Sequence, residues 1–273
     1  MPLQNRNNYF PSQPEIQRNT LRYQELKPIG MWFSKDIALF FQFKTENHSA
    51  TSLSLIPDGC FDMLFCCDPS IPTAFLWTSP FHRKKQPEFR KDCEYFGVRF
   101  FPEQTIIKLN SPLNELLAQK IPLMEVMSNV NSIIELIASG KSFSERIEQF
   151  DLFLRKLLFD SSKDQKMVCY AIEKIYSSRG MVNVHELSDV IGYSEQHIRK
   201  KFEAYIGFSP KQFCQIVKFQ NSLDIYLERD GSNILDIIYD NGYYDQAHFI
   251  KGFKKFINLT PKQYKKFLNE SNG

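Results

Sequence analysis

The 273-residue sequence predicts an α+β protein with two domains, a β-rich domain followed by an all-helical one. Three observations carry this prediction. The length suits about two domains of ~100–200 residues each. Short apolar runs between turn residues fill the first part of the chain, and the last part combines helical periodicity with an internal repeat. The hydrophobic fraction of 42% and the charged fraction of 24% are ordinary for a globular protein, which excludes wholesale disorder.

The β-rich domain is expected over residues 21–112, after a flexible segment at residues 1–20. Five short runs predict its strands, because they are rich in Phe, Ile and Val and are bounded by Pro, Gly, Asp or Ser. These runs are Ala38–Phe43, Ser52–Ile56, Met63–Cys67, Ala74–Trp77 and Tyr95–Phe101.

Three charged residues of this domain, Asp58, Asp62 and Arg99, have two open interpretations. In the first, they form a polar site for an effector. In the second, Pro57-Asp58-Gly59 is a turn, and Asp62 and Arg99 are a structural pair or simply exposed. The basic segment His82–Lys91 is expected to be a solvated loop, with accessory DNA contact as the alternative.

A helical segment is expected over residues 113–160. It contains an apolar stripe with 4-3 spacing, which predicts an amphipathic helix. The stripe either forms the seam of a homodimer, because this spacing suits helix pairing, or docks on the strand domain of its own chain. Its residues are Phe143, Ile147, Phe150, Leu154 and Leu157.

An internal repeat is the most informative feature of the helical domain, expected over residues 164–270. At an offset of 51 residues, Phe202 aligns with Phe253, and Ser209-Pro-Lys-Gln-Phe aligns with Thr260-Pro-Lys-Gln-Tyr. Two copies are too few for a solenoid, so a duplicated helical unit is the better interpretation.

Each copy predicts a helix-turn-helix unit, at residues 183–206 and 233–257. The same signals occur in both: an Asn that caps a helix, a Gly that ends it, a Ser or Asp that caps a second helix, and a Ser/Thr-Pro that opens a third. They are Asn183, Gly192, Ser194 and Ser209-Pro210, and then Asn233, Gly242, Asp245 and Thr260-Pro261.

The second helix of each unit has an apolar face and a polar, cationic face. The apolar face is suited to docking on a core, and the other to the major groove, where Gln pairs with adenine edges and Arg or Lys with guanine or phosphate. An ordinary amphipathic surface helix is the alternative, but the repetition of caps and faces favours DNA binding. The distribution of charge agrees with DNA binding by the helical domain. Residues 1–162 hold 18 basic and 18 acidic residues, whereas residues 163–273 hold 16 basic and 13 acidic residues.

The segments GYSEQHIRKKFEAYIGFSPKQF and ILDIIYDNGYYDQAHFIKGFKKFINLTPKQY resemble the DNA-binding domain of AraC/XylS-type transcription regulators. The resemblance covers about Lys166 to Leu268. It implies seven helices in two helix-turn-helix subdomains joined by a long helix from Pro210 to about Arg229. It also implies two recognition helices in successive major grooves, about 34 Å apart. The residues that it places against DNA are Gln196, Arg199 and Lys200, and then Gln246, Ala247, His248, Ile250 and Lys251.

The resemblance implies a cytoplasmic transcription regulator, an activator, whose partners are double-stranded DNA and RNA polymerase. The segments IPDGCFDMLF and YFGVRFFPEQ resemble the N-terminal domain of a subset of this family. That likeness implies a sensory or regulatory domain, with a small-molecule effector as one form of control. Because Ala247 and Ile250 offer no hydrogen bonds to bases, the first unit is expected to discriminate more between sequences.

Other function classes find little support. The six cysteines form no CxxC motif and the five histidines show no ligand spacing, so no metal and no other cofactor is expected. Neither a secretory signal nor a membrane span is expected. The sequence has no GxxxxGK[ST], HExxH or GxSxG motif, so we do not expect an enzyme. An enzyme with its catalytic centre in the β domain and a helical protein-interaction module remain as alternatives.

Overall fold

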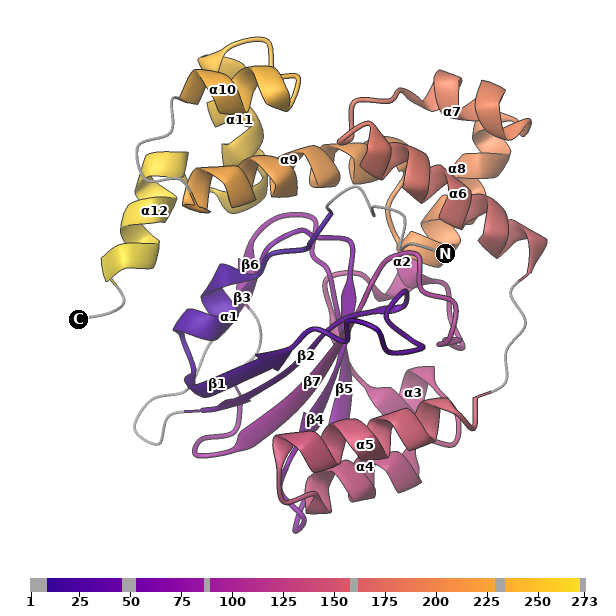
Figure 1. The fold of residues 1–273 in the computed structure, drawn as a ribbon, viewed down its shortest axis with the longest axis vertical. Coiled ribbons are helices and arrows are strands. Elements are labelled where there is room, and N and C mark those ends of the chain that lie inside the picture. The colour runs from indigo at the N-terminus through magenta and orange to yellow at the C-terminus, as the bar shows by residue number, and fades with distance from the viewer. Residues whose placement is uncertain (1–8, 46–52, 86–88, 158–161, 229–233, 271–273) are drawn as a thin grey trace.

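The computed structural model describes residues 9–45, 53–85, 89–157, 162–228 and 234–270, with the side chains of residues 234–236 left out (Figure 1). A twisted sheet with helices at one end lies below a long helix that carries two helical units (Figure 1). The predicted α+β architecture is therefore confirmed. In the part of the chain described, no helix combines the length and the apolar character that a membrane crossing needs.

The main sheet has six antiparallel strands, and a separate ribbon has two. Four of the five predicted strands lie in the main sheet, and the fifth, Ser52–Ile56, contributes to the ribbon. In spatial order its strands are β1 (Leu21–Leu26), β2 (Ile37–Lys44), β7 (Glu94–Phe100), β4 (Phe61–Cys66), β5 (Thr73–Thr78) and β8 (Lys120–Pro122). The ribbon pairs β3 (Ser54–Leu55) with β6 (Lys84–Lys85).

Both faces of the four central strands are largely buried, with side chains alternating between them, whereas the edge strand β1 is mostly exposed. Phe40, Phe65 and Phe96 point into one core, and Phe41 and Leu64 into the other. The first core is covered by the helices that follow the sheet in sequence. These are α2 (Leu113–Leu116), α3 (Leu123–Val126), α4 (Asn131–Ser139) and α5 (Phe143–Leu154).

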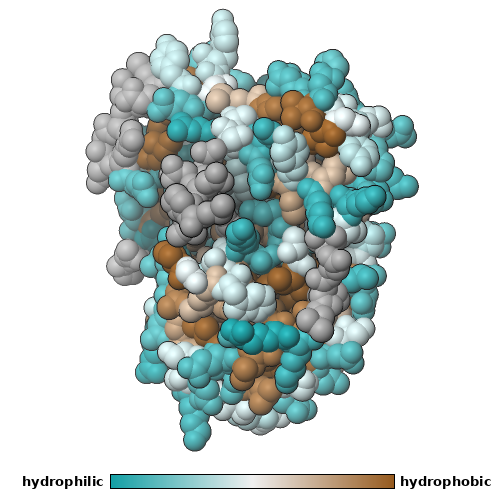
Figure 2. Space-filling view, turned by 45° about the vertical axis from the view of Figure 1, so that its right-hand side comes forward, coloured by the Kyte–Doolittle hydropathy of each residue, from teal (hydrophilic) through white to brown (hydrophobic). Residues whose placement is uncertain are grey.

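The apolar stripe of α5 packs on the sheet of its own chain. Phe150 is fully buried among Phe40, Phe65 and Phe100, and Ile147 and Leu154 are buried in the same core. The ends of the stripe, Phe143 and Leu157, are half-buried against this core. The structure therefore decides between the two interpretations, and the prediction of a dimer seam through these five residues is wrong. On the face shown in Figure 2, the remaining apolar groups form separate patches among polar ones.

Two segments expected to be flexible or solvated contain packed residues, although most described residues of the second, His82–Lys91, are exposed as expected. Residues 9–20, predicted within a flexible N-terminal segment, contain the short helix α1 (Pro14–Arg18), and Tyr9 stacks on Tyr176. The predicted solvated loop at His82–Lys91 contains strand β6, and its Arg83 forms an ion pair with buried Glu15. Residues 1–8 and 86–88 lie outside the described part.

From residue 163 onward the described chain forms seven helices, the number that the family resemblance implied. Helix α6 starts at Lys163, next to the predicted domain start at residue 164. The long connector α9 starts at Pro210, as predicted, and joins the two units (Figure 1). The helices are α6 (Lys163–Ser177), α7 (Val184–Ile191), α8 (Glu195–Ile206), α9 (Pro210–Glu228), α10 (Ile234–Asp240), α11 (Gln246–Ile257) and α12 (Pro261–Glu270).

The turn at Gly59 meets helix α9 at close range. Gly59 has a φ of +73°, in the left-handed region, and a Cβ added there would lie 2.5 Å from Cε2 of Phe213. Phe213 is fully buried. The turn therefore needs glycine both for its backbone conformation and for the approach of the aromatic ring.

We expect Gly59→Ala to lower the free energy of unfolding by about 2–4 kcal/mol, because left-handed strain adds to overpacking against Phe213. The matched control is Gly30→Ala. Gly30 also has a positive φ, +79°, but nothing lies within 4 Å of an added Cβ, so only strain of about 1 kcal/mol is expected there. Urea unfolding followed by circular dichroism measures both losses. Equal losses in the two variants would contradict the close contact between the turn and α9.

Candidate DNA-binding surface

The first helix-turn-helix unit begins with a complete capping box. The Asn183 side chain accepts from the Glu186 backbone N–H at 2.8 Å, and the Glu186 carboxylate accepts from the Asn183 backbone N–H at 3.3 Å. Helix α7 ends at Gly192, whose φ of +74° is left-handed. The Ser194 hydroxyl then accepts from the His197 N–H and caps α8. The local signals in the sequence thus produce the predicted helix, turn and helix.

The second unit repeats this construction. Gly242 follows α10 with a φ of +63°. The Asp245 carboxylate caps α11 by accepting from the His248 N–H at 2.7 Å. Its predicted first cap, Asn233, lies outside the described residues. Lys218 of α9 donates to the Gly242 carbonyl and lies over the Tyr243 ring, so the connector helix holds the turn of this unit.

The repeated Ser/Thr-Pro-Lys-Gln motif closes both units with the same contacts. Ser209 accepts from the Gln212 N–H at 3.3 Å, and the Gln212 side chain accepts from the Ser209 N–H at 2.8 Å. Thr260 and Gln263 make the equivalent pair at 3.2 and 2.9 Å. The Gln side chain is therefore part of a capping box that starts α9 and α12, a role not predicted from the sequence.

In the first unit, the three residues predicted to contact DNA are all exposed on α8. Gln196, Arg199 and Lys200 lie opposite the buried face of the helix. Arg199 is paired with Glu203 on the same helix at 2.8 Å, a weak surface contact that a phosphate can replace. The buried face, formed by Ile198, Phe202 and Ile206, is the one predicted.

A neighbouring lysine has a different role. Lys201 lies 2.6 Å from Asp164 of α6, and this contact lowers the pKa of the Asp164 carboxyl. His197, at the margin of the polar face, lies 3.7 Å from the same carboxylate. Asp164 therefore helps to orient α8 on α6 and leaves Lys200 exposed to solvent.

In the second unit, four of the five predicted residues are exposed on α11. Gln246, Ala247, His248 and Lys251 face solvent, whereas Ile250 is half-buried against the helical core. The structure thus reduces the surface that Ile250 offers to DNA. The His248 Nδ1 accepts from the Tyr244 backbone N–H at 3.3 Å, which leaves Nε2 free to face outward.

Two exposed tyrosines beside the recognition helices were missed. Tyr193 is 45% exposed and stacks on His197, and Tyr244 is 89% exposed. They lie in the turns that precede α8 and α11, where a phenol hydroxyl can contact a phosphate. Their separation is the same 51 residues that relates the two units, so the repeat itself carried the signal.

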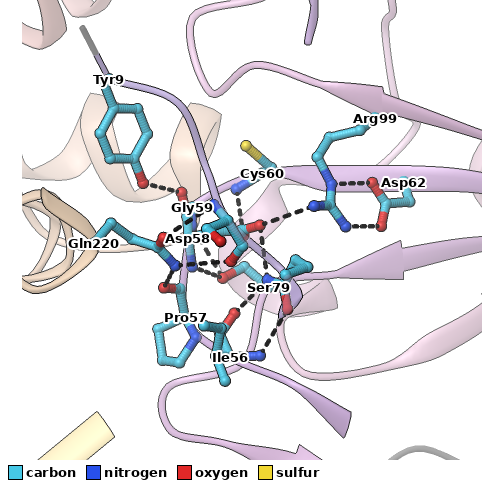
Figure 3. A network of polar contacts seen from close by, with 12 residues as sticks. Tyr9, Ile56, Pro57, Asp58, Gly59, Cys60, Asp62, Ser79, Arg99 and Gln220 are labelled. Carbon is cyan, nitrogen blue, oxygen red and sulfur yellow. Dashed lines mark hydrogen bonds and ion pairs between the residues drawn. The ribbon is translucent and has the colours of Figure 1, made fainter. Parts of the chain in front are cut away.

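The three charged residues of the strand domain form a buried network (Figure 3). Arg99 donates to both oxygens of Asp62 at 2.8 Å, and its Nη1 lies 3.9 Å from Asp58. Asp58 also accepts from the Cys60 N–H and the Gln13 side chain. Burial raises the pKa of the Asp62 carboxyl, and the Arg99 guanidinium opposes that rise. These carboxylates are occupied by partners of their own chain, which favours the structural interpretation over the effector site.

The same network reaches the connector helix. Gln220 of α9 donates to the Pro57 carbonyl at 2.7 Å and accepts from the Ser12 N–H at 3.0 Å. Gln220 is itself buried. The strand domain therefore holds the helix that carries both units through paired, solvent-excluded polar groups (Figure 3).

Within the described ranges, no group of three or more His, Cys, Asp or Glu side chains is arranged to hold a metal ion. Apart from the carboxylates of Glu195 and Glu203 on α8, the polar groups on the outer faces of α8 and α11 are amides, imidazoles, guanidinium and ammonium groups. Such groups suit base edges and phosphates.

Comparison with known proteins supports a helix-turn-helix domain in the C-terminal part of the chain. Residues 187–266 match a family described as a helix-turn-helix domain. An uncharacterized HTH-type transcriptional regulator of Staphylococcus aureus (strain MSSA476) is 33% identical over 84 residues, which are 31% of this chain and 11% of that protein. One of Haemophilus influenzae (strain ATCC 51907 / DSM 11121 / KW20 / Rd) is 27% identical over 118 residues, covering 43% of this chain and 39% of that protein. The chain thus spans only a minor part of both relatives.

Two solved structures are distant likenesses. ToxT from Vibrio cholerae, in a 1.65 Å structure, is 11% identical with a TM-score of 0.44, covering 90% of this chain and 98% of that one. The C-terminal domain of AraT, a response regulator from Geobacillus stearothermophilus, is 19% identical with a TM-score of 0.35, covering 39% of this chain and 88% of that one.

We expect Arg99→Met to lower the free energy of unfolding by about 3–5 kcal/mol, because the buried Asp62 carboxylate loses its partner. The matched control is Arg155→Met. Arg155 also pairs with an aspartate, Asp151, but its side chain is 57% exposed, so a loss of at most about 1 kcal/mol is expected. Chemical unfolding of both variants is the measurement. If Arg99→Met leaves the free energy of unfolding unchanged, the ion pair is dispensable to the fold. The interpretation of Arg99 as part of an effector site would then be favoured.

Proposed function

We propose that this chain, whose C-terminal part is a helix-turn-helix domain of the AraC/XylS type, is a sequence-specific DNA-binding transcription regulator and not an enzyme. The observation that carries the proposal is the duplication. Two units with the same caps each present an exposed polar helix, and both units pack on one connector helix (Figure 1).

In the proposed complex, α8 and α11 enter two successive major grooves on one side of the duplex, about 34 Å apart. Gln196 contacts a base edge in the first groove, and Arg199 and Lys200 contact guanine or phosphate. In the second groove Gln246 and His248 offer hydrogen bonds, Ala247 and the accessible edge of Ile250 contact thymine methyl groups, and Lys251 anchors on phosphate. Tyr193 and Tyr244 add backbone contacts at the start of each helix.

We infer that the strand domain regulates this DNA binding, because it holds α9 and α12 directly. The resemblance to AraC/XylS-type regulators supports activation of transcription through contact with RNA polymerase. Control by a small effector is part of the same proposal, but we do not place that effector at Asp58, Asp62 and Arg99, since these residues satisfy one another.

The first unit is proposed to discriminate more between sequences than the second. On a mapped operator, Lys200→Ala is expected to cost about 1–3 kcal/mol and to relax the base preference at one position. Lys251→Ala should weaken binding uniformly across sequences and reduce the salt slope by about one. Affinities for the operator and a set of single-base variants provide the comparison.

The matched control is Lys141→Ala. Lys141 is an exposed lysine in the turn between α4 and α5, at the opposite end of the molecule from the two units (Figure 1). Its removal should leave both affinity and discrimination unchanged. If Lys251→Ala loses more discrimination than Lys200→Ala, the proposed ranking of the two units is wrong.

Binding to random duplex DNA across a salt series tests DNA binding itself. If about five to seven phosphates are neutralised, the logarithm of affinity should fall with the logarithm of salt with a slope of roughly −5 to −6. The small excess of basic residues predicts weak affinity at physiological salt. An absence of binding even at low salt would count against the regulator and favour an enzyme or a protein-interaction module.

A further inference from the structure

Two cysteines meet at the end of the strand pair β4–β7, far along the sheet from the Asp62–Arg99 pair. Cys66 is the last residue of β4, and Cys93 immediately precedes β7. Their sulfur atoms lie 2.9 Å apart, and both side chains are buried. This separation exceeds the length of a disulfide bond, which is about 2.05 Å, by less than about 1 Å. The two strands already bring the sulfur atoms together without a change in the sheet.

The surroundings favour a thiolate on Cys66. A hydrogen bond from the Cys93 thiol lowers the pKa of Cys66 to about 7, and the Arg90 guanidinium, 3.6 Å from the Cys66 sulfur, adds to this effect. The same hydrogen bond raises the pKa of Cys93, which keeps its proton. Thr45 fixes Cys93, since its hydroxyl accepts from the Cys93 N–H at 2.9 Å.

The other four cysteines lack these features. Burial raises the pKa of Cys67, Cys169 and Cys214 to about 12 each, and it also raises that of Cys60. Arg99 and Arg146 also lower the pKa of Cys60 and Cys67, but burial outweighs them there. Cys66 is set apart by its thiol partner and by a guanidinium nitrogen 3.6 Å from its sulfur. The pair lies one layer below the surface, because Arg90, which covers it, has a side chain that is 43% exposed. A small oxidant reaches such a site through local opening, whereas a bulky one is excluded.

We propose that Cys66 and Cys93 are a reactive dithiol that hydrogen peroxide oxidises to an intrachain disulfide. The Cys66 thiolate attacks one peroxide oxygen, the O–O bond breaks, and the leaving oxygen takes a proton to become water. The Cys66 sulfur is then a sulfenic acid. The Cys93 sulfur attacks it, the S–S bond forms, and the sulfenic oxygen leaves as water with the Cys93 proton. Two thiols and one hydrogen peroxide give one disulfide and two waters.

This site is separate from the DNA-binding surface, but it acts on the same two strands as the polar network. Strand β4 carries Asp62 near its first end and Cys66 at its last, while β7 carries Arg99 opposite Asp62. A disulfide would therefore lock β4 to β7 at the end remote from α9, while the ion pair joins them at the end near α9.

The test uses the full-length protein, reduced, freed of reductant and treated with hydrogen peroxide. The protein is then unfolded in denaturant so that buried thiols become accessible, the remaining thiols are blocked with N-ethylmaleimide, and the peptides are mapped by mass spectrometry. We expect two of the six cysteines to escape alkylation, in one cross-linked peptide pair joining Cys66 to Cys93, and dithiothreitol to restore both thiols. Six alkylated cysteines, or oxidation confined to other positions, would overturn the proposal.

Variants separate the pair from its neighbour. Cys67→Ser removes the adjacent, half-buried thiol and should leave the cross-link intact. Cys93→Ala should abolish the cross-link and also slow the oxidation of Cys66, because it removes the hydrogen bond that lowers the pKa of the Cys66 thiol. Arg90→Ala should slow the loss of thiols several-fold. A cross-link that forms at the same rate without Arg90 would show that the guanidinium does not activate Cys66.

Discussion

The packing of helix α9 between the strand domain and both helix-turn-helix units is the constraint on which the rest of the structure depends. Phe213, near its start, contacts Phe202 of the first unit and Tyr9 of the N-terminal segment. Phe219, further along the same helix, packs on Phe253 and Phe256 of the second unit. One apolar core therefore runs through both units, so neither recognition helix is free to move without disturbing the other.

The strand domain fastens this core at two separated points. At the first, Gln220 binds the Pro57 carbonyl beside the buried Asp58. At the second, Glu15 accepts from Arg83 at 2.7 Å and from the Tyr264 hydroxyl of α12 at 3.1 Å. Both points are buried and polar. Separating the domains would therefore leave hydrogen-bonding groups that are now paired without their partners. The regulation proposed for the strand domain would therefore reach both units through α9, which they share.

The sequence predicted the features that depend on neighbouring residues. The glycines at the turns, the Ser and Asp caps and the buried faces of α8 and α11 are local signals, and the repeat doubled each of them. The sequence did not predict the role of a residue whose partner lies far away along the chain. Glu15 looked like part of a flexible tail because Arg83 and Tyr264 lie far away in sequence. Strands β1, β6 and β8 are short or polar. They form because the edge of a neighbouring strand offers hydrogen bonds, and no local sequence pattern predicts such pairing.

A hydroxyl-radical footprint on a bound operator tests the central claim most directly, because it reports which sugars each recognition unit shields. Two units packed on one connector helix predict two protected patches on one face of the duplex, separated by one helical turn of about 10 base pairs. A single protected patch, or two patches on opposite faces, would contradict the account, since α8 and α11 would then not act as one rigid pair.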